Sequence, residues 1–188
     1  MYTVSPAAAA VIVYSADLSG GQEVPPVTTT GAGFSLATVD TVLNTLRLQV
    51  LFGGLLGTTT MAHIHCCAPV GANAGVATPV PSFPDFPLGV SSGSYDRTFD
   101  LTLASSFNPA FITANGGTVA GARTALLNGL ASNLAYLNIH TNRNPGGEIR
   151  GQFAAPVPEP ASWALMLAGF GLAGWSLRRR ARPIPAMA

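Results

Sequence analysis

The stretch AYLNIHTNRNPGGEIRGQF (residues 135–153) determines the fold class that this sequence predicts. Its two ends, residues 135–141 and 148–153, alternate in polarity as a β-strand does. Between them lies Asn144-Pro145-Gly146-Gly147, a run of residues that favour tight turns. The stretch therefore predicts a β-hairpin.

Strand patterns of the same kind occur along residues 11–155, separated by turns rich in glycine and proline. A helix is expected from Thr118, its N-cap, to Asn133, and a short helical turn with Asn108 as its cap and Pro109 in its first position. The long loop between residues 68 and 94 is expected to be ordered by packing of Phe83 and Phe86. About seven strands with a helical insertion predict a mainly β fold, an antiparallel sandwich or barrel. The other expected strands are VIVYSADL (11–18), GFSLATVD (33–40), TLRLQVLF (45–52), MAHIH (61–65) and YDRTFDLTL (95–103).

The charge balance argues against nucleic-acid binding. Only 9% of the 188 residues are charged, and lysine is absent. Residues 1–155 carry five arginines and seven acidic residues, a net charge of −2, whereas nucleic-acid binding requires a basic face. The remaining arginines cluster near the C-terminus, at Arg178, Arg179, Arg180 and Arg182.

Both ends of the chain read as export signals. Residues 161–177 carry no charge and are followed at once by Arg178, Arg179 and Arg180, so they predict one transmembrane helix whose C-terminal side stays in the cytoplasm. Residues 1–10 lack a basic region and a long apolar run, but contain the small-residue stretch SPAAAA. We expect residues 1–10 to be the remnant of an export signal whose true start lies upstream.

Residues 61–75, MAHIHCCAPVGANAG, hold two of the three histidines and both cysteines. Side chains two apart on a strand share a face, so His63 and His65 point the same way. If the hairpin lies beside this strand, His140 converges with them, and three imidazoles suit Cu²⁺ or Zn²⁺. The adjacent Cys66 and Cys67 leave three options: a redox-active disulfide, two free thiols, or thiolate ligation, for which only Cys67 shares the histidine face.

A structural hydrogen-bond network is the alternative interpretation of the same residues. Buried histidines bonded to Asn138, Glu148 or backbone carbonyls would form a polar seam without metal. Arg150 would donate charge-assisted hydrogen bonds to Glu23 or Glu148 and so lock the sheet ends together. No motif for a nucleophile, a phosphate loop or a zinc protease occurs, which favours a non-enzymatic role.

The body of the chain resembles the CHRD domain, first defined in chordin. The matching blocks are LSGGQEVPPV (18–27), GAGFSLATVD (31–40), LRLQVLFGGLLG (46–57), MAHIH (61–65), AYLNIHT (135–141) and NPGGEIRGQF (144–153). The resemblance implies an immunoglobulin-like all-β fold for residues 11–155. In chordin these domains accompany modules that bind growth factors. This chain has no such module, so growth-factor binding is not carried over.

Residues 156–182 resemble a PEP-CTERM sorting signal, in which a Pro-Glu-Pro tripeptide precedes a hydrophobic helix and an arginine cluster. The tripeptide here is Pro158-Glu159-Pro160. The resemblance implies export, anchoring in the inner membrane, and processing by an exosortase. It also implies a destination at the cell surface or in the extracellular polysaccharide matrix.

Two functional hypotheses follow. The first is an exported surface or matrix protein with a single CHRD domain and a binding or structural role. The second is an exported metalloprotein with copper or zinc at His63, His65 and His140, and with redox chemistry at Cys66-Cys67.

Overall fold

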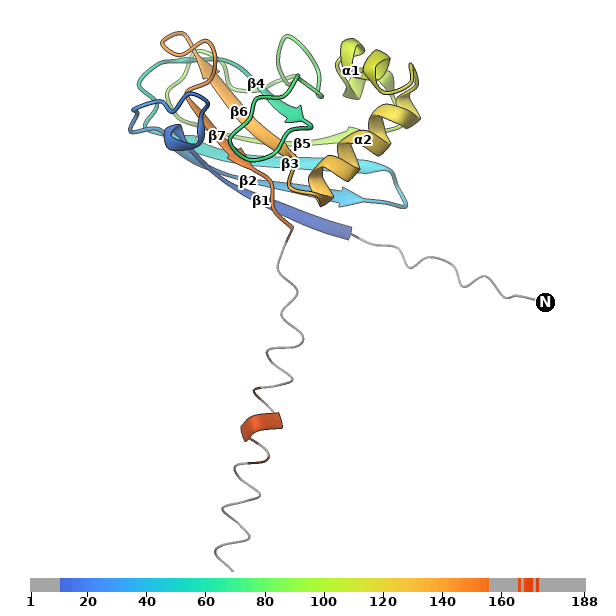
Figure 1. The fold of residues 1–188 in the computed structure, drawn as a ribbon. Coiled ribbons are helices and arrows are strands. Elements are labelled where there is room, and N and C mark those ends of the chain that lie inside the picture. Colours follow the sequence, from blue (N-terminus) through green and yellow to red (C-terminus); the bar gives the residue numbers. More distant parts are fainter. Residues whose placement is uncertain (1–10, 156–165, 167, 171, 173–188) are drawn as a thin grey trace, which may run out of the picture. The chain divides into compact units, whose positions relative to one another are not determined.

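The computed structural model describes residues 11–155, 166, 168–170 and 172. Residues 11–155 form one antiparallel sheet of seven strands in the order β4-β6-β7-β1-β2-β3-β5 (Figure 1). The strands are β1 (Val11–Ser19), β2 (Ala32–Asp40), β3 (Thr45–Gly53), β4 (Thr59–Cys66), β5 (Gly93–Asp100), β6 (Ala135–Thr141) and β7 (Ile149–Gln152). The two short 3₁₀ turns are η1 (Gly20–Gln22) and η2 (Ala104–Ser106).

The mainly β class and the antiparallel pairing are confirmed, and of the two expected architectures the structure is nearer to the barrel than to an immunoglobulin-like sandwich of two sheets. The seven strands form a single curled sheet, a half-barrel, with β4 and β5 at its two edges. Strand periodicity shows which residues face the core, but not which element covers them. Here loops and helices cover the sheet, where a sandwich would have a second sheet.

The predicted hairpin is confirmed, because β6 pairs with β7 and Asn138 lies opposite Arg150. Strand β4 pairs with the other side of β6 and places His63 opposite Asn138. Hence β6 is central to this part of the sheet, and all seven of its residues are buried. Leu137 and Ile139 face the hydrophobic core, which leaves Tyr136, Asn138 and His140 on the opposite face.

Two helices lie at one end of the sheet (Figure 1). Helix α1 (Pro109–Ala114) begins with Asn108, whose side chain accepts from the Ala110 N–H, and α2 (Val119–Ala131) with Thr118, which accepts from Gly121. Both caps were predicted, because a side-chain oxygen at this position satisfies a free backbone N–H of the first turn. Leu126 and Leu130 bury the inner face of α2 in the core.

The long loop between β4 and β5 runs back along the edge of β4. The N–H groups of Ala77 and Phe83 donate to the carbonyls of Ile64 and Ala62. Phe83 and Phe86 are buried, which confirms the prediction that they order the loop. The edge strand β4 is thus covered, and the loop carbonyls come close to its side chains.

The expected export segments are mostly outside the described residues. Residues 1–10, the tripeptide Pro158-Glu159-Pro160 and Arg178 to Arg180 are not among them, and of the expected helix 161–177 only residues 166, 168–170 and 172 are described. Across the part of the chain that the structure describes, no helix is both long and apolar enough to cross a membrane.

Candidate metal centre

The three histidines of the chain converge on one face of β4 and β6. We call His63, His65 and His140 the histidine cluster. The His63 ring centroid lies 5.9 Å from that of His65 and 5.5 Å from that of His140, and His65 and His140 are 6.0 Å apart. The expected convergence is therefore confirmed. It arises because β6 pairs directly with β4, so that residues of one face become neighbours across the strands.

Each histidine ring is held in place by a backbone carbonyl. His63 Nε2 lies 2.8 Å from Pro81 O, His65 Nδ1 lies 2.9 Å from Ala74 O, and His140 Nδ1 lies 2.8 Å from Pro145 O. A carbonyl only accepts, so in each ring this nitrogen must carry the hydrogen. The other nitrogen is then an unprotonated lone-pair donor, which is the form that binds metal.

The second nitrogen of each ring points into the cluster without a partner. His63 Nδ1, His65 Nε2 and His140 Nε2 are buried and make no hydrogen bond. One ligand atom from each ring lies within 4.8 Å of the others. Metal–imidazole bonds of about 2.0–2.1 Å span at most roughly 4 Å between two ligand nitrogens, so closure needs movements of roughly 1 Å or less. The donor set fits Zn²⁺ or Cu²⁺.

Burial keeps the cluster neutral. Desolvation lowers the pKa of His63 and of His65 to about 4, against the opposing effect of the carbonyl hydrogen bonds. It lowers the pKa of His140 as well. The imidazole rings are therefore uncharged at neutral pH and need lose no proton to bind a metal ion.

Aromatic and cationic side chains extend this face towards β7. The Tyr136 ring stacks on His65 with centroids 4.9 Å apart, and the Arg150 guanidinium lies 4.6 Å from the Tyr136 centroid. Arg150 donates to the Gln22 carbonyl and to Asn73 Oδ1. The predicted hydrogen bonds from Arg150 to Glu23 or Glu148 are thus replaced by these two, because the loops that contain Gln22 and Asn73 reach the guanidinium.

The two buried glutamates have different environments. Burial favours the neutral form of both, but Glu148 accepts hydrogen bonds from Thr29, Thr141 and the N–H groups of Leu56 and Gly57, which lower its pKa to about 2. Glu23 has only the Asn138 amide, at 3.4 Å, and the nearby charge of Arg150. Desolvation therefore dominates and raises the pKa of Glu23 to about 7.

Cys66 and Cys67 form a disulfide with each other. A disulfide sulfur is not a thiolate, so the expectation that Cys67 ligates the metal is corrected. The disulfide lies against α2, where a Cβ added at Gly129 would come within 2.3 Å of Cys66 Sγ. It also lines a cavity of about 460 Å³ together with Val76 and Phe111.

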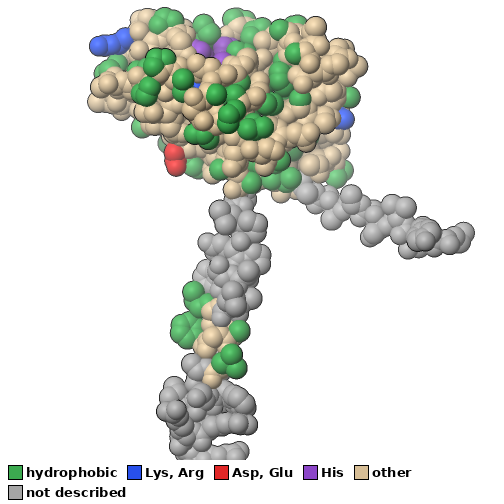
Figure 2. All heavy atoms as spheres, viewed as in Figure 1, with side chains coloured by type: hydrophobic (Ala, Val, Ile, Leu, Met, Phe, Trp, Pro, Cys, Tyr) green, Lys and Arg blue, Asp and Glu red, His purple; other side chains and the backbone are tan. Residues whose placement is uncertain are grey.

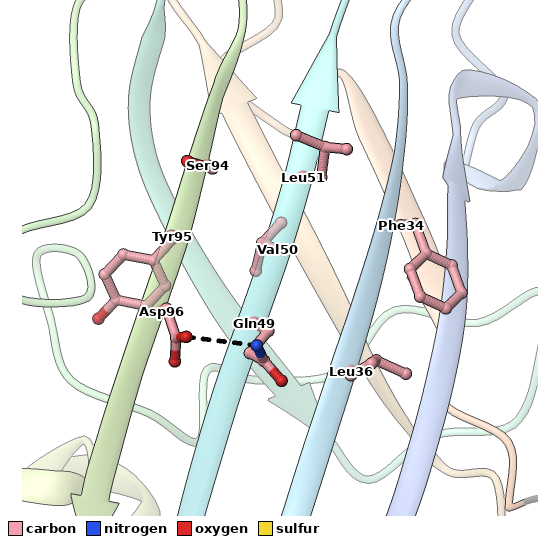
Figure 3. A pocket seen from close by; sticks show the side chains of 8 residues that line it. All are labelled: Phe34, Leu36, Gln49, Val50, Leu51, Ser94, Tyr95 and Asp96. Carbon is pink, nitrogen blue, oxygen red and sulfur yellow. Dashed lines mark hydrogen bonds between the residues drawn. The ribbon is translucent and has the colours of Figure 1, made fainter.

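A shallow depression on β2, β3 and β5 contains no such cluster (Figure 3). Phe34, Leu36 and Leu51 give it an apolar floor, and its carboxylate, Asp96, is already paired with Arg47 and accepts from Gln49. Histidine atoms, by contrast, are visible at the surface of the domain in Figure 2. The histidine cluster is therefore the stronger candidate for a functional site.

Sequence reasoning named backbone carbonyls as partners of the histidines, but it did not identify which three carbonyls orient the rings, and it missed the pairing of Glu23 with Asn138. The carbonyls belong to loops, where no periodicity reports the direction of a backbone group. The sequence contains one indication of these carbonyls, because β4, which carries His63 and His65, is followed at once by a proline-rich loop.

Comparison with known families identifies two segments of the chain. Residues 14–153 match the CHRD domain, and residues 156–180 match the PEP-CTERM protein-sorting motif. The chain belongs to the CHRD domain family and carries a PEP-CTERM sorting motif, which indicates export, sorting to the cell surface and processing by an exosortase. Searches of curated proteins and of solved structures found no match.

Proposed function

We propose that this exported CHRD protein binds a copper or zinc ion at His63, His65 and His140. The observation that carries the proposal is the set of three buried imidazole nitrogens that converge without a hydrogen-bond partner. A purely structural seam would use both nitrogens of each ring, because an unpaired buried polar atom costs roughly 1–3 kcal/mol. The carbonyl partners on the opposite nitrogens are the usual outer support of metal-binding histidines.

We also propose that residues 161–177 anchor the protein in the inner membrane before an exosortase acts. The uncharged run and the arginines that follow it support this order, with Arg178, Arg179 and Arg180 on the cytoplasmic side. The metal-binding domain would then act outside the cytoplasm, at the cell surface or in the extracellular polysaccharide matrix. A binding or structural role of the metal-loaded domain agrees with the absence of a nucleophile motif from the sequence.

Equilibrium dialysis of the purified chain against Cu²⁺ or Zn²⁺ tests the metal site. We expect one equivalent of bound metal, and a large loss of affinity for His63→Ala, His65→Ala and His140→Ala. Ser35→Ala is the matched control, because Ser35 is fully buried and polar but its hydroxyl donates to Gln49 O, on the paired strand β3. Less than about a tenth of an equivalent bound, or equal binding by all four variants, would reject the site.

A further inference from the structure

Five buried side-chain polar atoms lack a hydrogen-bond partner among the described residues, and all five lie on the face of the histidine cluster or next to it. Three are the cluster nitrogens, and the other two are Glu23 Oε1 and Asn138 Oδ1. Buried polar atoms are nearly always satisfied, so a group of this kind indicates a missing partner. The three nitrogens are accounted for by the proposed metal ion, but the two oxygens are not.

The two oxygens lie next to the cluster and next to each other. Asn138 is directly opposite His63 in the pairing of β4 with β6, and it shares a face with His140 two residues on. A Cβ placed at Gly147 would be 2.4 Å from Asn138 Oδ1 and 2.6 Å from Glu23 Oε1, so both oxygens border one small space. The same turn provides Pro145 O, the acceptor for His140.

Glu23 is a neighbour of the metal position and not one of its clustered ligands. Glu23 is not among the groups whose ligand atoms all lie within 4.8 Å of one another, which are the three histidines alone in the described residues. Zinc sites with three protein ligands keep a fourth position for water. A bound water has two hydrogens, and the face offers two acceptors that lack donors.

We propose that the fourth metal position holds an exchangeable water molecule that donates its hydrogens to Glu23 and Asn138. This inference rests on the proposed metal site. It defines the ligand class as well: the position accepts water or another small ligand, because His63, His65 and His140 are each less than 10% exposed and leave no room for a large one. The carboxylate of Glu23 favours ligands that carry a hydrogen and disfavours anions.

Azide binding to the Co²⁺-loaded full chain tests this arrangement, since visible Co²⁺ absorption reports a change of ligand. At pH 8, where Glu23 is ionised, we expect azide to alter the spectrum of the wild type, and to bind at least about tenfold more tightly to Glu23→Gln, because that variant removes a nearby negative charge. Asn138→Asp adds a charge at nearly the same shape and should weaken azide binding. Asp96→Asn, on the distant strand β5, should behave as the wild type.

The outcomes separate this inference from the proposed function. If Co²⁺ binds stoichiometrically but saturating azide leaves the spectrum unchanged, the metal site stands and the exchangeable position is rejected. If azide binds with the same affinity to the wild type, Glu23→Gln and Asn138→Asp, the role of the two oxygens is rejected. If Co²⁺ itself does not bind, both proposals fail.

Discussion

The polar side chains at the two ends of the curled sheet differ in whether they have hydrogen-bond partners. At the end formed by β2, β3 and β5, Asp96 on the outer face is exposed and paired, with Arg47 Nε donating at 2.8 Å. At the end formed by β4, β6 and β7, buried polar atoms remain without partners. Unpaired buried polar groups lower the stability of the fold. The contrast therefore distinguishes a surface whose polar groups bond to solvent from one whose polar groups need a ligand.

Glu148 and Glu23 repeat this contrast within the second end. Glu148 is enclosed by four donors and ties β6 to the loops before β2 and β4. Glu23 is also buried, but its carboxylate has one long side-chain hydrogen bond. The first carboxylate therefore stabilises the fold, whereas the second remains available to a ligand.

Removal of Glu148 should have the largest effect. Glu148→Ala leaves two backbone N–H groups, of which that of Gly57 is buried, and two hydroxyls without their acceptor, and we expect a loss of about 4 kcal/mol in the free energy of unfolding. Urea unfolding at neutral pH measures it. A loss below about 1 kcal/mol would show that Glu148 does not tie the sheet together.

Gly147→Ala should rank second, with Gly146→Ala as its matched control. Gly147 has φ +129°, a conformation that L side chains rarely adopt, and a Cβ there would collide with Asn138 and Glu23. We expect a loss of about 3 kcal/mol and weaker metal binding. A Cβ at Gly146 meets nothing within 4 Å, so Gly146→Ala should change both properties little. Equal losses in the two variants would contradict the crowding described at Gly147.

Glu23→Gln should stabilise the metal-free chain in a pH-dependent way. The pKa of Glu23 is about 7 when folded against an ordinary 4.5, so the folded state holds this proton more tightly. Glu23 therefore does not lower the free energy of unfolding below pH 4.5, and it lowers this free energy increasingly as the pH rises from 4.5 to 7. We expect Glu23→Gln to raise stability by roughly 2–3 kcal/mol at pH 8, as the rise of the pKa from 4.5 to about 7 implies, and by almost nothing at pH 4. Thermal unfolding at both pH values measures this, and a gain independent of pH would refute the account of Glu23.

Asp96→Asn should have the smallest effect. Its ion pair with Arg47 is solvent-exposed on both sides, and such pairs contribute little to stability. We expect no measurable change in thermal unfolding or in metal binding. A clear loss of metal binding would contradict the claim that only the end formed by β4, β6 and β7 takes part in metal binding.

The sequence predicted the strands and both helix caps, because these follow from local patterns, and it predicted the convergence of the histidines on the condition that the hairpin lies beside residues 61–65. His63 and His65 share a face by alternation, whereas His140 reaches them through the pairing of β6 with β4, which joins segments far apart in the sequence. The single curled sheet was not predictable in this way, since alternation does not identify the covering layer. The deep burial of Glu23 was also missed, because it depends on how a loop folds over Asn138.

X-ray absorption spectroscopy of the copper- or zinc-loaded chain tests the central claim most directly. The account predicts a first shell of three imidazole nitrogens at about 2.0 Å and one light atom from solvent, with the imidazole scattering reduced in His140→Ala. A shell of oxygen or sulfur atoms without imidazole scattering would contradict it.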